Sequence, residues 1–157
     1  MGFKETLHRN VDQTSWPGQI PVHYRYLYGL AGEKFFRGLK DEGKFYATVS
    51  PEASKVYCPP TLFCEETFEA LTDWIELPPV GTVESFTLCY EDSDGAEQAP
   101  VAIAAIQLEG ADTVFLHRVI GIDPEAVYIG MRVQAKFLPK KQRRGHLDDI
   151  AGFEPVA

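Results

Sequence analysis

Thiols and imidazoles are the side chains in this sequence that could bind a metal or act as nucleophile and base. The 157 residues include three cysteines, Cys58, Cys64 and Cys89. A structural zinc site needs four ligands, usually thiolate or imidazole, on two turns of spacing Cys-x-x-Cys. No cysteine pair has that spacing, and no histidine lies between His23 and His117. The sequence therefore predicts that zinc is absent and that no cofactor is tightly bound, and an odd cysteine number without an export signal predicts reduced thiols.

A local cluster of basic residues is the second feature that could bind a ligand. Six cations lie within thirteen residues: Arg132, Lys136, Lys140, Lys141, Arg143 and Arg144. Lysine and arginine bind phosphate through charge-assisted hydrogen bonds. If coenzyme A binds, we expect its phosphates to meet Lys136, Lys140, Lys141 and Arg143. The alternative, a solvated strand face with a basic loop, stays open because charge runs usually are solvated surface.

Catalytic patterns are missing from the sequence. It contains no Gly-rich phosphate loop, no H-E-x-x-H and no G-x-S-x-G. His117 and Arg118 stand within an apolar strand, and no nucleophile or acidic orienting group is recognisable beside them, so we interpret His117 as a structural hydrogen-bonding residue. We therefore expect no catalytic residues and no enzyme activity of the chain by itself.

Composition restricts the class of partner. The chain is 45% hydrophobic and 24% charged, with a net charge of −8 and a pI near 5.0, so its surface as a whole repels nucleic acid and anionic lipid. No run approaches the roughly 20 apolar residues of a membrane span, and the first residues lack the apolar core of a signal peptide. We expect a cytoplasmic protein.

The elements that must position these groups begin with an arm and a helix. Residues 1–20 have no sustained period and read as an arm lying on another surface. From residue 21 to residue 40 the spacing of Tyr28, Ala31, Phe35 and Leu39 predicts one face of a helix, which Gly43 is placed to end. Core packing is one interpretation of this aromatic face, and a partner-binding stripe is the other.

The remaining chain predicts short strands. Breakers exclude a helix over residues 45–68, and residues 69–80, ending in Pro78-Pro79, predict a stiff linker. Apolar or alternating segments follow at residues 83–90, 101–108, 114–120, 131–137 and 150–153. A helical turn is expected near residues 124–128. The set is mainly β and fits a small barrel, although periodicity does not distinguish an OB fold from another barrel or a sandwich.

One segment resembles a known family. Ser50-Pro-Glu-Ala53-Ser-Lys-Val-Tyr-Cys58-Pro59-Pro60-Thr-Leu-Phe-Cys64-Glu-Glu-Thr67 is similar to the ribbon C-x-x-C-G-x-V-x-x-P-P-R-x-x-C-x-x-C of the domain of unknown function 35 proteins. On that pattern Ser50 and Ala53 take the first pair of ligand positions, and Cys64 and Thr67 take the second. Only Cys64 is a thiol, and Thr61 replaces the common arginine. The small replacements could preserve the turns without metal. The alternative is a Pro-rich loop that was never a ribbon.

The resemblance extends over residues 21–157, through Tyr28–Phe36, Pro79–Thr87 and Gly130–Val133. It implies N-terminal helices, a degenerate zinc-ribbon-like β unit and a five-stranded OB-fold barrel. We place the boundaries at 1–44 for the arm and helical region, 45–68 for the ribbon-like segment and 69–157 for the linker and OB fold.

The resemblance also implies a function. It predicts a noncatalytic accessory subunit that associates with a thiolase or related condensing enzyme and helps to bind an acyl-CoA. One alternative is an OB-fold protein that binds single-stranded nucleic acid through Tyr90, Phe115 and Phe137, although the acidic total speaks against it. A purely architectural subunit without a ligand is the other alternative.

Overall fold

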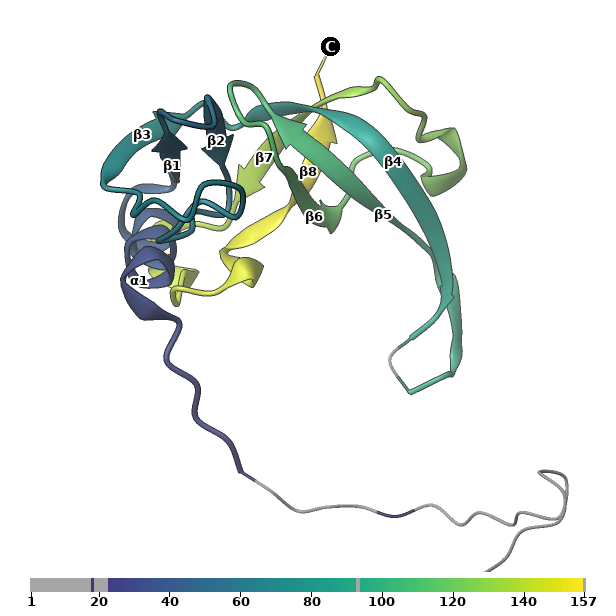
Figure 1. The fold of residues 1–157 in the computed structure, drawn as a ribbon. Helices are drawn as coiled ribbons and strands as arrows, with labels where there is room; N and C mark the ends of the chain where they lie inside the picture. The colour runs from purple at the N-terminus through teal and green to yellow at the C-terminus, as the bar shows by residue number, and fades with distance from the viewer. Residues whose placement is uncertain (1–17, 19–22, 93, 157) are drawn as a thin grey trace, which may run out of the picture.

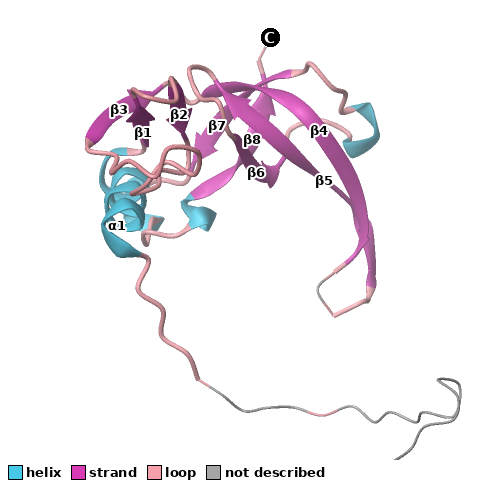
Figure 2. Cartoon of the chain, viewed as in Figure 1, coloured by secondary structure: helices cyan, strands magenta, loops and turns pink. Residues whose placement is uncertain are grey.

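The computed structural model describes residue 18 and residues 23–92 and 94–156. The chain forms one N-terminal helix, a three-stranded sheet and then a five-stranded sheet, all pairs antiparallel within each sheet (Figure 1). Figure 2 shows that strands dominate, as predicted. No helix in the described ranges is long and apolar enough to cross a membrane.

The helix α1 spans Gly29–Arg37 and continues into the π-helical turn η2, Gly38–Glu42. Ala31, Phe35 and Leu39 are buried, whereas Tyr28 is 57% exposed, so three of the four predicted face residues belong to the core. Gly43 ends the helical segment with φ of 71°, a left-handed conformation that favours glycine, and its N–H donates to the Gly38 carbonyl at 2.8 Å.

The first sheet has the strand order β2-β1-β3, with β1 at Phe45–Ser50, β2 at Lys55–Tyr57 and β3 at Asp73–Leu77. The prediction of a linker over residues 69–80 is wrong for residues 73–77, which form the strand β3. This strand pairs with β1 from Phe45 opposite Leu77 to Val49 opposite Asp73. Of the β3 residues only Leu77 is buried, so the segment lacks the apolar alternation that would have revealed a strand.

The second sheet has the order β6-β5-β4-β7-β8. Its strands are β4 (Val80–Glu91), β5 (Glu97–Leu108), β6 (Val114–Arg118), β7 (Arg132–Phe137) and β8 (Ile150–Pro155). The predicted helical turn is the 3-10 turn η3, Pro124–Ala126. The two end strands approach at one isolated parallel bridge, Val119 to Phe153. The five predicted strands are therefore present as a curled sheet, and a single bridge takes the place of a continuous closing ladder.

One hydrophobic core joins the helix and both sheets. Phe45 on β1 lies at its centre, with ring centroids 6.4 Å from Phe35 of α1, 5.7 Å from Phe115 of β6 and 6.3 Å from Phe153 of β8. All four rings are at most 2% exposed. Because each unit contributes to the same buried cluster, neither sheet has a complete core of its own.

Candidate functional site

The four predicted ribbon positions lie together at one end of the first sheet. Ser50 ends β1, and Ala53 lies in the turn to β2 with its N–H donating to the Ser50 hydroxyl at 3.1 Å. Cys64 and Thr67 share a second turn, in which the N–H of Phe68 donates to the Cys64 carbonyl at 3.0 Å. The Thr67 and Ser50 side chains lie beside the Cys64 sulfur. Two turns therefore face each other around a single thiol.

These residues do not fit a zinc ion. Ser50, Ala53 and Thr67 offer neither thiolate nor imidazole, and no cluster of three or more His, Cys, Asp or Glu side chains suited to a metal occurs in the described part of the chain. Hydrogen bonds between protein groups connect these turns where the resemblance would place a zinc ion. The carboxylate of Glu69 accepts from the Ser50 hydroxyl and from the Glu52 N–H, the latter at 3.3 Å.

The Cys64 sulfur lies in a polar but closed environment. Hydrogen bonds from Thr67, then from Tyr57 and Ser50, lower the pKa of Cys64 to about 6. The Tyr57 hydroxyl lies 3.3 Å from the sulfur, and this bond, with burial, raises the pKa of Tyr57 to about 12. Cys64 is only 1% exposed, however. A thiolate that substrates cannot reach stabilises its surroundings and does not act as a nucleophile.

The pKa of Cys58 is shifted in the direction opposite to that of Cys64. Its side chain is buried, and burial raises the pKa of Cys58 to about 12, so the thiol stays protonated at neutral pH. Thr113, in the loop before β6, fixes the Cys58 backbone by accepting from its N–H and donating to its carbonyl, both at 2.8 Å. Cys58 is therefore a core residue at the contact between the two sheets.

The predicted coenzyme A cations separate into two groups in the structure. Lys140 and Lys141 are exposed on the 3-10 turn η4, Lys140–Gln142. The Lys136 ammonium pairs with Glu154 of the neighbouring β8 at 2.6 Å. Arg143 turns inward, donating to the Leu138 carbonyl at 2.6 Å and stacking its guanidinium 5.3 Å from the Phe137 ring centroid. Lys140 and Lys141 thus lie together, while Lys136 and Arg143 are engaged within the fold.

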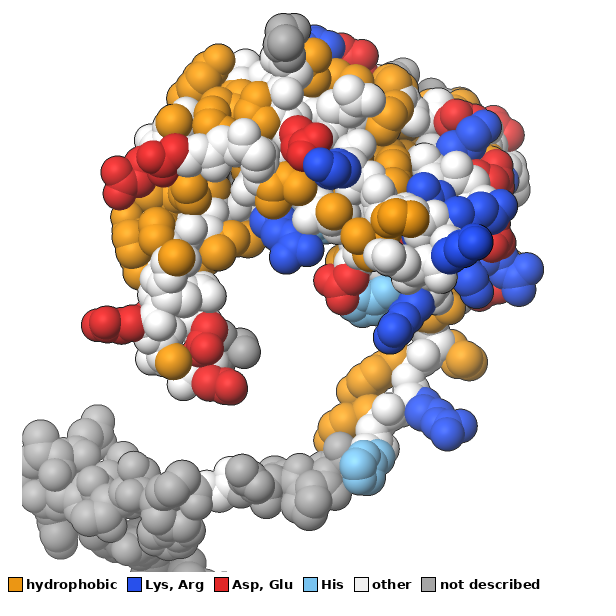
Figure 3. All heavy atoms as spheres, turned by 180° about the vertical axis from the view of Figure 1, so that it is seen from behind, with side chains coloured by type: hydrophobic (Ala, Val, Ile, Leu, Met, Phe, Trp, Pro, Cys, Tyr) orange, Lys and Arg blue, Asp and Glu red, His pale blue; other side chains and the backbone are white. Residues whose placement is uncertain are grey.

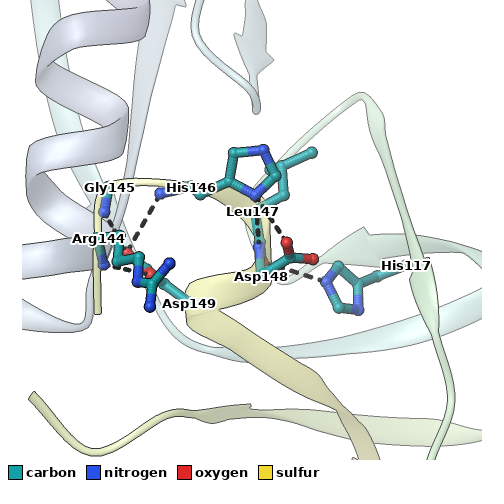
Figure 4. Close-up of polar contacts among 7 residues, drawn as sticks. All are labelled: His117, Arg144, Gly145, His146, Leu147, Asp148 and Asp149. Carbon is teal, nitrogen blue, oxygen red and sulfur yellow. Dashed lines mark hydrogen bonds and ion pairs between the residues drawn. The ribbon is translucent and has the colours of Figure 1, made fainter. Parts of the chain in front are cut away.

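A hollow of about 850 Å³ adjoins Lys141, and Arg144 and His146 line it as well. Asp149, 2% exposed, shapes this loop because its carboxylate accepts from the N–H groups of Arg144 and Gly145 at 2.7 Å and of His146 at 3.3 Å (Figure 4). We call Lys140, Lys141, Arg144 and His146 the basic loop. Sequence reasoning left Arg144 and His146 out of the predicted site, although Asp149 four residues after Gly145 is a recognisable capping signal.

His117 is a packed side chain. Its ring stacks on Phe115 with centroids 5.9 Å apart, and its Nε2 atom lies 3.4 Å from the Leu147 carbonyl (Figure 4). Burial lowers the pKa of His117, and its buried Nδ1 atom has no hydrogen-bond partner among the described residues. Arg118 donates to the Ala151 carbonyl at 2.7 Å. The structural interpretation of this pair agrees with these contacts.

The rings predicted for nucleic-acid stacking do not form a platform. Tyr90 is 52% exposed, but Phe115 is 2% exposed and belongs to the core. Phe137 is half-buried, between Phe45 and the Arg143 guanidinium. That part of the alternative prediction is wrong, because the inward alternation of β6 turns Phe115 away from any ligand.

The comparisons with known proteins concern this same sheet. Residues 74–138 match the family described as ChsH2, C-terminal OB-fold domain. A crystal structure of a protein of unknown function from the DUF35 family of Sulfolobus solfataricus is 24% identical, with a TM-score of 0.59 over 82% of this chain and 83% of that chain. A chain of the structure described as Ltp2-ChsH2(DUF35) aldolase is 21% identical, with a TM-score of 0.61 over 83% of this chain and 98% of that chain.

At these identities the two structures establish likeness of fold. No curated protein matches the sequence significantly. The order β6-β5-β4-β7-β8, with one parallel bridge from Val119 to Phe153, describes a curled five-stranded sheet that is not closed. The match over residues 74–138 and the likeness of fold to a DUF35 family protein together support a DUF35-type OB-fold domain in this chain.

Proposed function

We propose that this chain is a noncatalytic accessory subunit that associates with a thiolase or related acyl-CoA condensing enzyme and helps to bind the acyl-CoA. The observation that carries the proposal is the fold match along 98% of a chain from an assembly whose description joins two proteins, Ltp2 and ChsH2 (DUF35), under the word aldolase. The DUF35 resemblance supplies the class of partner.

The chemistry-bearing side chains support a noncatalytic role. Cys64 and Cys58 are buried, and His117 packs between Phe115 and Phe153. Each is held by core contacts rather than directed into the hollow beside Lys141. We also propose that the ribbon position holds no zinc, since the hydrogen-bonded side chains around Cys64 take the place of ligands.

The basic loop is the candidate contact for coenzyme A. Lys141 and Arg144 line the hollow together with Asp148 and Asp149, and Lys140 is exposed on the same turn as Lys141. Arginine binds phosphate bidentately, and lysine binds it as a point charge. Two of the four residues first predicted, Lys140 and Lys141, remain in this proposal. Arg144 and His146 are added, although His146 lies 3.0 Å from the Asp148 carboxylate, and Lys136 and Arg143 are left out because their cationic groups are paired or packed within the fold.

Affinity purification tests the partnership. The tagged chain, expressed in its native host, is expected to bring down an enzyme subunit of the thiolase class in fixed stoichiometry, identified by mass spectrometry. Elemental analysis of the same sample is expected to find no stoichiometric zinc. Recovery of the chain alone, from cells that express such an enzyme, would contradict the proposed function.

Calorimetric titration with coenzyme A tests the ligand. Lys140→Glu with Lys141→Glu is expected to weaken binding about tenfold or more, because a hydrogen bond to a charged group is worth roughly 1.5–3 kcal/mol. Lys44→Glu is the matched control, since its ammonium pairs with Glu76 on the first sheet. Partner binding without coenzyme A binding would favour the architectural alternative.

A further inference from the structure

The hairpin of β4 and β5 extends beyond the sheet to which it belongs. Each strand has twelve residues. On one side β7 pairs only with Val80–Thr82, and on the other β6 reaches only to Ile103 of β5. The Val119 N–H also donates to the Ala102 carbonyl at 2.9 Å, so the two strands pair only with each other from Cys89 and Val101 to the turn. Figure 1 shows this arm curving away from the rest of the molecule.

A two-stranded ribbon of this kind needs a surface to cover it. Isolated hairpins are marginally stable in water, because two strands cannot bury an apolar face by themselves. Phe86 and Tyr90 on β4 are 36% and 52% exposed. The loop with exposed Tyr128 and Ile129 adjoins the base of the arm, where the Gly130 N–H donates to the Val83 carbonyl at 2.8 Å.

The charge on the arm is of one sign. Residues 56–117 contain twelve Asp and Glu residues and no Lys or Arg. Five of the twelve belong to the hairpin and its turn: Glu84, Glu91, Asp92, Asp94 and Glu97. None of these five forms an ion pair within residues 18, 23–92 and 94–156. In Figure 3 acidic side chains cluster at the far end of the arm and hydrophobic ones gather over the arm, while most cations lie on the opposite side of the molecule and a few lie near the centre of the view.

We propose that the β4–β5 arm is a docking arm whose occupant is a protein surface with an apolar recess bordered by lysine and arginine. Charge complementarity supports this partner, because unpaired carboxylates around exposed rings match cations around an apolar centre. The same carboxylates repel nucleic acid and anionic membranes. The inference rests on the proposed function, since it names the surface through which the accessory subunit meets its enzyme.

Affinity measurements on the reconstituted complex test the arm. Glu91→Lys with Glu97→Lys, and separately Phe86→Ser with Tyr90→Ser, are each expected to weaken enzyme binding about tenfold or more. The matched control, Glu52→Lys with Glu125→Lys, changes two exposed carboxylates outside the arm and is expected to alter affinity less than about twofold. Thermal unfolding of each variant verifies that the fold is retained.

Photo-crosslinking in the native host identifies the occupant. A benzophenone amino acid at Tyr90 is expected to crosslink to a Lys- or Arg-containing peptide of the enzyme, whereas the same probe at Phe63, exposed on another loop, is not. An enzyme that copurifies but neither crosslinks at Tyr90 nor responds to the arm variants overturns the docking arm and leaves the proposed function standing.

The remaining outcomes of the crosslinking experiment also test the docking arm and the proposed function. Crosslinking at Tyr90 only to a second copy of this chain, for example to its basic loop, overturns the enzyme as occupant. Absence of any crosslink at Tyr90 overturns the arm whatever copurifies. Failure to recover an enzyme counts against the proposed function, and the crosslinked peptide then still reports whether the arm meets a basic protein surface.

Discussion

His117 and Cys64 carry an imidazole and a thiol, groups that can act in catalysis or bind metals. In both cases burial and the neighbouring side chains determine the role of the group. Each lies among residues that a sequence reader would place far away: Leu147 near His117, and Tyr57 and Ser50 near Cys64. Both are enclosed by packing. Their energetic roles can therefore be tested through stability rather than through reaction rates.

Protonation of His117 is expected to destabilise the fold. Burial lowers the pKa of His117 below that of an unperturbed histidine, about 6.5, so the unfolded chain binds the proton more readily. The contribution of neutral His117 is complete above the unfolded pKa and is lost as pH falls toward the lower, folded pKa. His117→Phe should therefore show a smaller drop in Tm between pH 7 and pH 5 than the wild type. Equal slopes in the variant and the wild type would contradict the assignment.

Removal of the Cys64 thiol is expected to cost about 1–3 kcal/mol of unfolding free energy, the usual penalty for leaving a buried hydroxyl without its partner. Tyr57 is 3% exposed and would lose its contact with the sulfur. Denaturant unfolding of Cys64→Ala measures the change. Cys89→Ala, at a half-buried thiol, should change stability by less than about 1 kcal/mol. Equal effects at the two positions would argue against the hydrogen-bonded role.

At the scale of elements, the turn after β1 and the turn from Cys64 to Phe68 lie together and are stabilised by hydrogen bonds. Glu69 links them, because its carboxylate accepts from Ser50 and its carbonyl accepts from the Cys64 N–H at 3.0 Å. If this geometry is what the resemblance implies, thiols at the replaced positions should complete a metal site.

The triple variant Ser50→Cys, Ala53→Cys and Thr67→Cys is expected to bind one zinc or cobalt ion with Cys64 as fourth ligand. Two Cys-x-x-Cys turns facing each other supply a tetrahedral thiolate set. Cobalt absorption in the thiolate charge-transfer and tetrahedral ligand-field regions reports the site, and the wild type should show neither band. The same variant with Cys64→Ser is the control. Tight metal binding by the wild type would contradict the proposed loss of zinc.

At the scale of the whole molecule, Phe45 joins the parts. Its ring contacts α1, β6 and β8 from a strand of the first sheet. The two sheets should therefore unfold in one transition, with Trp74 fluorescence reporting on β3 and circular dichroism on the whole chain. Separate midpoints for the two signals would show that the sheets are energetically independent.

Phe45→Ala is expected to destabilise the whole chain by about 3–5 kcal/mol, since it opens a cavity where both sheets meet. Phe63→Ala, at an exposed ring, should have little effect. Denaturant unfolding followed by both signals measures the loss. A Phe45 variant that shifts only the Trp74 signal would contradict a shared core.

The sequence by itself determined the elements that local patterns specify. Helical spacing identified Ala31, Phe35 and Leu39, Gly43 marked the end of the helix, and apolar or alternating segments indicated the strands β4 to β8. The DUF35 resemblance correctly indicated an OB fold. These features depend on patterns of residues along the chain, so they can be predicted from the sequence.

Only the tertiary structure decided which residues of those elements are buried and which are exposed. Leu77 is the one buried residue of β3, so that strand exists because β1 pairs with it and not because of its own pattern. Arg143 is indistinguishable from Arg144 in sequence, yet Leu138 and Phe137 hold the first inside while the second lines the hollow. Residue type sets which contacts a side chain can make, but only the packing of distant strands determines which of them it makes.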